Sequence, residues 1–248
     1  WTSTGSIVFA EVAGGMVAIS DHPGFLAAAA LLIFCGAVGK SAQFPLHIWL
    51  PPAHAGAPAA ASAVLSALVI KGSWFLVVRL WFDVMPGVVT LPSAQLLAGL
   101  GATAIIVGSV VALRQERLKL LVAYSTIAQI GYLFLMFPLA FDASGSTLVH
   151  GTVLTGGLLQ AVSHATAKAG MFMAAGLIYA ALGHDRIADL AGVARAMPVT
   201  VLAFAVAGLA LMGVVPSGAY VAKKLLLDAA DSSGQWWWTI VLQGGAAF

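Results

Sequence analysis

Charged residues are scarce in this 248-residue sequence: 8% are Asp, Glu, Lys or Arg, whereas 61% are hydrophobic. Soluble domains carry about 25% charged residues, so this composition indicates an integral membrane protein. The few charges are scattered and sum to a formal +2, which excludes the basic surface that nucleic-acid binding requires. The lipid bilayer is therefore the expected surroundings of most of the chain.

Cysteine and the short motifs of cofactor chemistry are also lacking. The single cysteine, Cys35, lies in an apolar run, so the sequence has no disulfide framework and no cluster of metal ligands. It contains no dinucleotide fingerprint, no phosphate-binding loop and no nucleophile elbow. We therefore expect no cofactor and no metal, and we expect the chain itself to carry out no redox or bond-making reaction.

Long apolar runs, in contrast, are plentiful, and a spanning helix needs about 20 such residues. Trp1–Ser20 suits the end of one helix, and Leu50–Pro58 and Asp228–Gln235 are predicted to be a turn region and a loop. Seven spans or partial spans follow the first segment: Phe25–Trp49, Ala59–Phe82, Ser93–Leu113, Leu120–Phe141, Leu148–Leu182, Pro198–Leu227 and the stretch from Trp236. The sequence predicts an all-α polytopic transmembrane bundle, with residues 1–248 forming a single domain that is a fragment of a longer protein.

The loops alternate in charge with each predicted span. The connections around Arg117 and Arg195 are rich in Lys and Arg, whereas the loops at Asp21, Asp83 and Asp142 carry acids without them. Basic loops stay on the cytoplasmic side of a membrane. We therefore expect the basic connections, and by parity the prolines after Leu50, to face the cytoplasm.

Two lysines stand alone in apolar sequence. A lysine at the centre of a membrane helix costs about 2.5–3.5 kcal/mol on insertion scales, so a chain that keeps one usually uses it. Lys71 lies in the middle of a predicted span. Burial favours the neutral form of its amine, which allows the amine to gain and lose a proton. The alternative is a permanently charged lysine paired with an acid. Lys40 follows Gly39 and precedes Pro45. The proline interrupts the helix, so the Lys40 amine can reach water. The alternative is that the Lys40 side chain extends along the helix to the membrane interface.

Three polar groups share one face of the predicted span Leu148–Leu182. Gln160, His164 and Lys168 are spaced by four, which stacks them on one helical face, and Ser163 adjoins them. Small shifts in the pKa of a histidine are enough to change its protonation near pH 7. The pair His164 and Lys168 therefore predicts a short proton relay. A single buried histidine is more often structural, but three polar groups on one stripe favour a functional role.

A second predicted helix break lies near the end of the chain. Pro216 and Gly218 interrupt the apolar run, and Lys223 and Lys224 follow them. Broken backbone inside a bilayer survives only where protein or water satisfies it. We therefore expect one of the two lysines, Lys223, to reach the bundle interior and the other to reach the interface.

The remaining polar candidates have plainer alternatives. Gln129, with Tyr124, Ser125 and Thr126, adds hydrogen-bonding groups to one span, and such groups can simply join helices. His47 and His54 lie near the predicted cytoplasmic turn. Either they conduct protons toward the bundle interior, or they are ordinary surface residues.

Five sequence blocks, in order, resemble the antiporter-like membrane subunits of respiratory complex I, of Mrp-type cation/proton antiporters (their D-type subunits) and of group 4 hydrogenases. The blocks are GKSAQFPLHIWLPPAHAGAP, SALVIKG, RLKLLVAYSTIAQIGY, SHATAKAGMF and GVVPSGAYVAKKLLL. The resemblance covers essentially the whole chain. It implies part of a fourteen-helix fold with two inverted five-helix repeats, each with a discontinuous helix. It also implies membrane-subunit partners in the bacterial inner membrane, protons as the transported ion, and Na⁺ as a candidate second ion.

The resemblance also assigns roles to residues. Five positions match the family's proton path, on the broken seventh helix, the eighth, the eleventh (two) and the broken twelfth: Lys40, Lys71, His164, Lys168 and Lys223. In the family, the counterpart of Lys40 pairs with a glutamate on the fifth helix, which would precede Trp1. Gln129 and Gln160 depart from relatives that carry a histidine or lysine at the first position and a histidine at the second, so that water would have to complete the relay there.

Three hypotheses follow. The first is a proton-translocating subunit of a larger complex of the complex I or Mrp type, with protons moving along a central line of buried lysine and histidine. The second is a membrane scaffold whose lysines are satisfied by lipid headgroups or partner acids; outward-facing lysines would favour it. The third is a sodium/proton exchanger working alone, which would need acidic ligands, and Glu11 is almost the only acid the spans offer.

Overall fold

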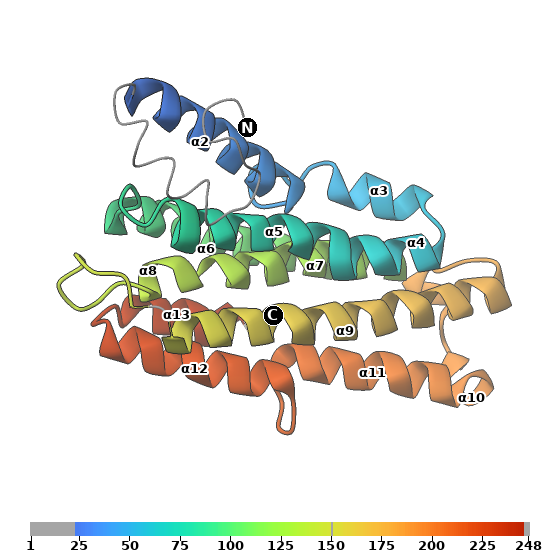
Figure 1. The fold of residues 1–248 in the computed structure, drawn as a ribbon. Helices are drawn as coiled ribbons and strands as arrows, with labels where there is room; N and C mark the ends of the chain where they lie inside the picture. Colours follow the sequence, from blue (N-terminus) through green and yellow to red (C-terminus); the bar gives the residue numbers. More distant parts are fainter. Residues whose placement is uncertain (1–22, 150, 246–248) are drawn as a thin grey trace.

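The computed structural model describes residues 23–149 and 151–245. Its helices run side by side in one bundle, with α9 in the middle, α2 and α3 at one edge and α11 and α12 at the other (Figure 1). Trp1–Ser20 and Glu11 lie outside the described residues. The helices, including π-helical segments η1 and η2 and 3₁₀ segment η3, are α2 (Pro23–Lys40), α3 (Leu50–Gly56), α4 (Ala59–Val64), η1 (Leu65–Val69), α5 (Ile70–Arg79), η2 (Leu80–Val84), α6 (Leu91–Leu113), α7 (Leu118–Phe134), α8 (Met136–Leu139), α9 (Gly151–Leu182), η3 (Ile187–Asp189), α10 (Val193–Ala196), α11 (Pro198–Met212), α12 (Gly218–Ser232) and α13 (Trp237–Gly244).

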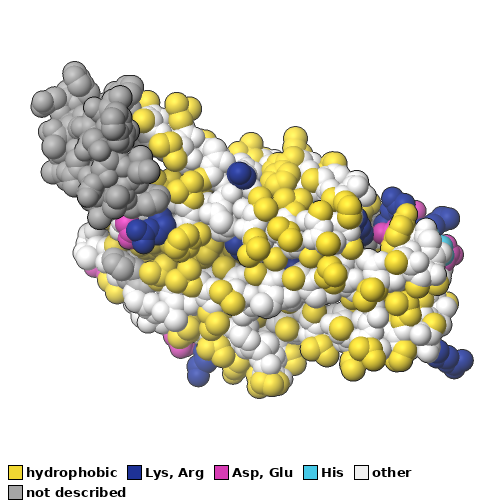
Figure 2. Space-filling view, turned by 45° about the vertical axis from the view of Figure 1, so that its right-hand side comes forward, with side chains coloured by type: hydrophobic (Ala, Val, Ile, Leu, Met, Phe, Trp, Pro, Cys, Tyr) yellow, Lys and Arg dark blue, Asp and Glu magenta, His cyan; other side chains and the backbone are white. Residues whose placement is uncertain are grey.

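Within the described ranges, four helical segments are long and apolar enough to cross a membrane: Ala59–Val84, Leu91–Leu113, Leu118–Leu139 and Gly151–Leu182. The last has 32 residues and is about 48 Å long at 1.5 Å per residue, longer than the roughly 30 Å hydrocarbon core. Hydrophobic side chains cover the middle of the molecule, while most charged side chains gather toward its two ends (Figure 2). The protein is thus an all-α, multi-pass membrane bundle, as the sequence predicts.

Two helices are discontinuous. α2 includes Gly39 in its last turn and ends at Lys40, and Pro45 lies in the irregular segment before α3. The indole N–H of Trp49 donates to the carbonyl of Gly39 at 3.0 Å, which satisfies a carbonyl at the helix end.

The second interruption separates α11 from α12. α11 ends before Gly213, whose φ of 79° is the left-handed conformation that closes helices. Pro216 lies inside the interruption and Gly218 opens α12. The hydroxyl of Ser217 accepts from the backbone N–H of Tyr220 at 3.1 Å, which caps the new helix.

Two boundaries predicted from the sequence are wrong. The predicted turn region Leu50–Pro58 contains helix α3, because its prolines occupy the first turn, where backbone N–H groups lack intrahelical partners and a missing N–H costs little. The predicted loop Asp228–Gln235 is helical as far as Ser232. There Ala229 and Ala230 are buried while Asp228, Asp231 and Ser232 are exposed, so the segment is an amphipathic helix.

Helices α6 and α7 approach each other closely through glycine. A Cβ atom on Gly108 would lie 2.7 Å from the backbone nitrogen of Ala128 and 3.0 Å from the carbonyl oxygen of Tyr124. Small residues allow such backbone contact between membrane helices. This packing fixes α7, which carries much of the candidate site.

Replacing Gly108 with Ala should therefore destabilise the bundle by about 1–3 kcal/mol, because the new methyl group would force the two backbones apart. Gly99→Ala is the matched control on the same helix, since a Cβ there meets nothing within 4 Å. Thermal unfolding in detergent should show a lower melting temperature for the first variant alone. Equal melting temperatures for both variants would contradict this packing.

Candidate functional site

The polar stripe predicted on one helix lies in the bundle interior. Gln160, His164 and Lys168 are all buried on α9. The same face continues to Phe172, which is fully buried, and to Gly176 near the helix end. α9 therefore presents a line of polar groups to α7 and to the helices packed on it.

Lys168 is held by α7. The side chain has no exposed surface, and its Nζ donates to the carbonyl of Val122 at 3.1 Å and to the hydroxyl of Ser125. Both acceptors are neutral oxygens. Among the described residues the side-chain ion pairs join arginine to aspartate, so Lys168 has no carboxylate partner there.

Lys71 lies on α5 and is 8% exposed. Its Nζ donates to the carbonyl of Ser66, which belongs to η1; π-helical turns inside α-helices occur frequently at functional sites. Trp74, one turn away, donates its indole N–H to the carbonyl of Leu133 at 3.2 Å and so anchors α5 on α7. The alternative of a lysine paired with an acid thus has no support among the described residues.

Hydrogen-bonding residues from η1 and α7 lie between the two buried lysines. The hydroxyls of Ser66 and Thr126 lie 3.2 Å apart, and Thr126 donates to the carbonyl of Val122 at 2.9 Å. That carbonyl also accepts from Lys168. Lys71 binds the backbone carbonyl of Ser66 and Thr126 contacts its hydroxyl. Ser66, Thr126 and Val122 therefore form a group of neighbouring residues that lies between the two lysines. Ser66 was not among the residues predicted from the sequence; its one signal there is a small polar residue five positions before Lys71.

Two buried histidines accompany these amines. Neither ring nitrogen of His164 or His54 has a hydrogen-bond partner among the described residues, and both side chains have no exposed surface. His164 lies within electrostatic reach of Lys71 and Lys168. His54 stacks on Phe172 with ring centroids 4.4 Å apart and lies within reach of the same lysines. His54 is therefore not the surface residue of the plainer alternative.

The line on α9 continues toward Lys223. The side-chain amide of Gln160 donates to Gln129 on α7 at 3.2 Å. Both glutamines line a small cavity of about 20 Å³, and so does Lys223, which is half-buried on α12. Next to this line, Gly218 leaves room for the hydroxyl of Ser163. The cavity thus brings the predicted supporting glutamines and the predicted terminal lysine together.

Two other predicted site residues lie differently. Lys40 is exposed at the end of α2 rather than buried in a line with Lys71. The cause is the position of α2 at the edge of the bundle, where it packs on α5 (Figure 1). His47 is half-buried and stacks on Phe44, with ring centroids 5.4 Å apart.

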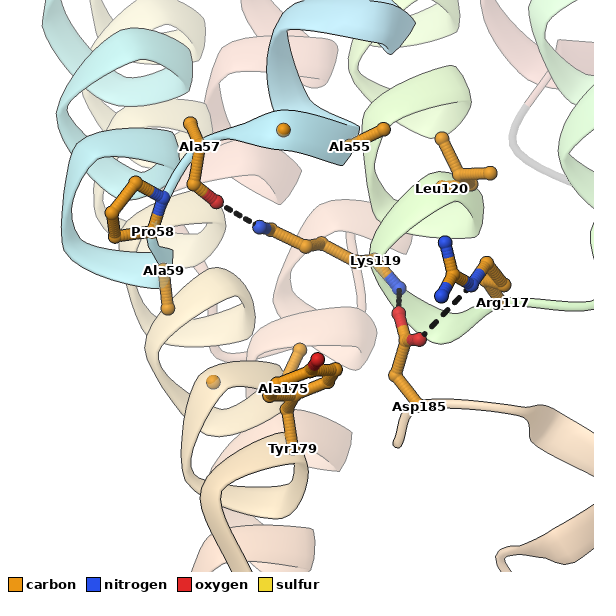
Figure 3. A pocket seen from close by; sticks show the side chains of 12 residues that line it. Ala55, Ala57, Pro58, Ala59, Arg117, Lys119, Leu120, Ala175, Tyr179 and Asp185 are labelled. Atoms are coloured by element: carbon orange, nitrogen blue, oxygen red, sulfur yellow. Dashed lines mark hydrogen bonds and ion pairs between the residues drawn. The ribbon is translucent and has the colours of Figure 1, made fainter. Parts of the chain in front are cut away.

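A larger cavity of about 360 Å³ opens at the end of the bundle where α3 and α4 meet α7 and α9. Its wall carries Lys119, whose Nζ donates to the carbonyl of Ala57 (Figure 3). Asp185 accepts from the backbone N–H of Lys119 at 3.2 Å and pairs with Arg117 at 3.3 Å. Ala55 also lines this cavity and is the neighbour of His54 in α3. The buried histidine therefore lies close behind the cavity wall.

The chain is similar to known membrane proteins. The family model described as NADH:quinone oxidoreductase/Mrp antiporter, TM, matches residues 1–248. The chain belongs to this family. NADH-quinone oxidoreductase subunit N of Desulforudis audaxviator is 34% identical over 92% of this chain and 44% of that protein. A probable K⁺/H⁺ antiporter protein of Rhizobium meliloti, which combines the A and B subunits in its name, is 39% identical over 84% of this chain and 20% of that protein.

Solved members of this antiporter-like family have the same fold. A chain of the Mrp complex from Dietzia sp. superposes with a TM-score of 0.83 at 25% identity, over 98% of this chain and 43% of that one. A chain of an archaeal membrane-bound sulfane sulfur reductase gives 0.83 at 26% identity, over 99% and 48%. The chain spans less than half of each of these relatives. The family and the helical membrane fold predicted from the sequence are confirmed.

Proposed function

We propose that this chain is the proton-conducting part of a longer subunit in a membrane complex of the complex I or Mrp antiporter type. The observation that carries the proposal is that two buried amines, Lys71 and Lys168, are both held by neutral oxygens, with the hydroxyls of Ser66 and Thr126 in contact between them. Buried ionisable groups are expensive in a membrane and mark ion pathways. Relatives that are named as oxidoreductase and antiporter subunits support the same function.

In the proposed path, protons move between Lys71 and Lys168 and then along α9. The hydroxyls of Ser66 and Thr126 can each donate and accept a hydrogen bond, whereas the carbonyls only accept and hold the amines in place. His164 lies between Lys168 and Gln160 on the same face and passes the proton toward Lys223. These groups titrate as one network, because each charge changes the proton affinity of the others.

The large cavity beside Lys119 is the proposed access point for protons. Arg117 and Lys119 line it together with Asp185. By the positive-inside rule this end would face the cytoplasm, and we propose the inner membrane of a bacterium as the location. His54, buried behind Ala55 and stacked on Phe172, is the group that would take up the proton. A transmembrane voltage of 100 mV is worth about 2.3 kcal/mol per charge, so each site need change its proton affinity only modestly.

The partners that we propose are other membrane subunits, with Na⁺ or K⁺ as the exchanged ion. Lys40 is exposed on an edge helix, where an acid from another helix of the longer protein would complete its pair. The rival hypothesis, a non-conducting scaffold, expects its lysines to face lipid. Lys40 and Lys224 do face outward, but Lys71 and Lys168 share one interior, which favours conduction.

The test is Lys71→Met in the full-length subunit, within its whole complex, reconstituted into liposomes. We expect proton transport to fall on the order of tenfold or more, the scale of losing a group that carries protons, with normal assembly. Lys224→Met, an exposed lysine on α12, is the control and should transport normally. Normal proton transport by Lys71→Met would refute the proposed function and would favour the scaffold hypothesis.

A further inference from the structure

The large cavity beside Lys119 carries more positive than negative charge. We propose that it binds the phosphate group of an anionic phospholipid, held by Lys119 and Arg117. The cavity volume of about 360 Å³ lies within the range of about 300–1,000 Å³ that is typical of ligand sites. A phosphate group fills part of this space and leaves room for water beside it. The inference concerns what the cavity binds, so it holds whether or not the chain conducts protons.

Two cationic side chains and one carboxylate line this cavity: Lys119, Arg117 and Asp185. The carboxylate of Asp185 is already neutralised, since it pairs with Arg117 at 3.3 Å and accepts from the backbone N–H of Lys119 at 3.2 Å. The half-buried amine of Lys119 takes part in none of the ion pairs among the described residues. One positive charge is therefore left for an anion that comes from outside the chain.

The two cationic groups also keep hydrogen-bond donors for such an anion. The Lys119 side chain reaches across the cavity from α7 and donates to the carbonyl of Ala57 (Figure 3). An ammonium group has three donors and a guanidinium group has five, so Lys119 and Arg117 have more donors than these contacts use. Charge-assisted hydrogen bonds from such groups to phosphate oxygens are among the strong ones. The site thus offers both the charge and the donors that a phosphate group requires.

The depth of the cavity favours a lipid phosphate over a free one. Three membrane-crossing segments have their ends at its wall: Ala59 begins one, Lys119 is the second residue of another, and Tyr179 lies three residues before the end of the third. The ends of spanning helices lie near the lipid headgroups, where tyrosine is enriched. Basic pockets between membrane helices on the cytoplasmic side bind phosphate-bearing headgroups. The occupant that fits this place is therefore an anionic phospholipid.

The test is Lys119→Gln in the full-length subunit, within its whole complex, purified in detergent and titrated with a short-chain phosphatidylglycerol. Binding is measured as the rise in melting temperature with lipid concentration. We expect the variant to bind roughly tenfold more weakly, the scale of one charge-assisted hydrogen bond. Arg195→Gln is the matched control, since it removes an exposed charge from α10 outside the cavity lining, and it should bind as the parent does.

The same titration separates the sources of the phosphate group. Tighter binding of phosphatidylglycerol than of phosphatidylcholine, whose headgroup has no net charge, supports the inference. Equal binding by the parent and Lys119→Gln would overturn it, and so would equal binding of the two lipids. Displacement of the lipid by inorganic phosphate at equal concentration would assign the site to a free phosphate and overturn the lipid.

A high-resolution map of the parent complex in nanodiscs with phosphatidylglycerol gives an answer that depends on no variant. It should show a phosphate within hydrogen-bond distance of the Nζ atom of Lys119, and a cavity that holds only water would overturn the inference. Neither measurement uses proton transport. A failure here therefore leaves the proposed function standing, and a failure of Lys71→Met to lose transport leaves this site standing.

Discussion

Replacing Lys168 with Met is expected to reduce proton transport on the order of tenfold or more while the subunit still folds and assembles. Met keeps the length of the side chain and removes the amine. The two acceptors that remain can satisfy each other, because the hydroxyl of Ser125 already donates to the carbonyl of Val122 at 3.0 Å. Removing a buried charge without leaving a buried charged partner behind is often neutral or stabilising.

The Lys168→Met experiment therefore needs two readouts. The initial rate of proton transport by the reconstituted complex should collapse, and the melting temperature should stay equal to or above that of the parent. Lys224→Met is again the matched control on an exposed face. A variant with a lower melting temperature and an unchanged transport rate would make Lys168 a structural residue and contradict the proposed path.

Replacing His164 with Leu should separate function from stability even more sharply. Both imidazole nitrogens are buried without hydrogen-bond partners among the described residues, which costs stability unless the group is used. Leu fills similar space and carries no polar atom. We expect the variant to be more stable by about 1–2 kcal/mol and to transport protons on the order of tenfold more slowly.

Thermal unfolding and proton transport of His164→Leu are measured side by side, with His184→Leu in the connection after α9 as the control. That control should leave transport unchanged. A structural histidine would give the reverse pattern, namely a less stable variant that still transports. Such a pattern would remove His164 from the path.

Local patterns predicted much of this structure. Long apolar runs gave the spanning helices, and the proline chemistry near Pro45 and Pro216 gave the two interruptions. The spacing of four along α9 placed Gln160, His164 and Lys168 on one face, because helical periodicity is a property of the segment itself. Where prolines are tolerated in a first helical turn, as in α3, the same reasoning wrongly predicted a turn.

The contacts between distant segments were beyond the sequence. Ser66 and Thr126 are 60 residues apart and meet because η1 lies against α7. The burial of Lys71 and the exposure of Lys40 likewise depend on which helices stand beside them.

The most direct test of the central claim is proton flux through the assembled complex, measured for three single variants at equal amounts of assembled protein. We expect flux to fall on the order of tenfold or more for Lys71→Met and Lys168→Met, and to stay at the parental level for Lys224→Met. Parental flux through either of the first two would contradict it, since a proton would then cross the membrane without one of the two buried amines.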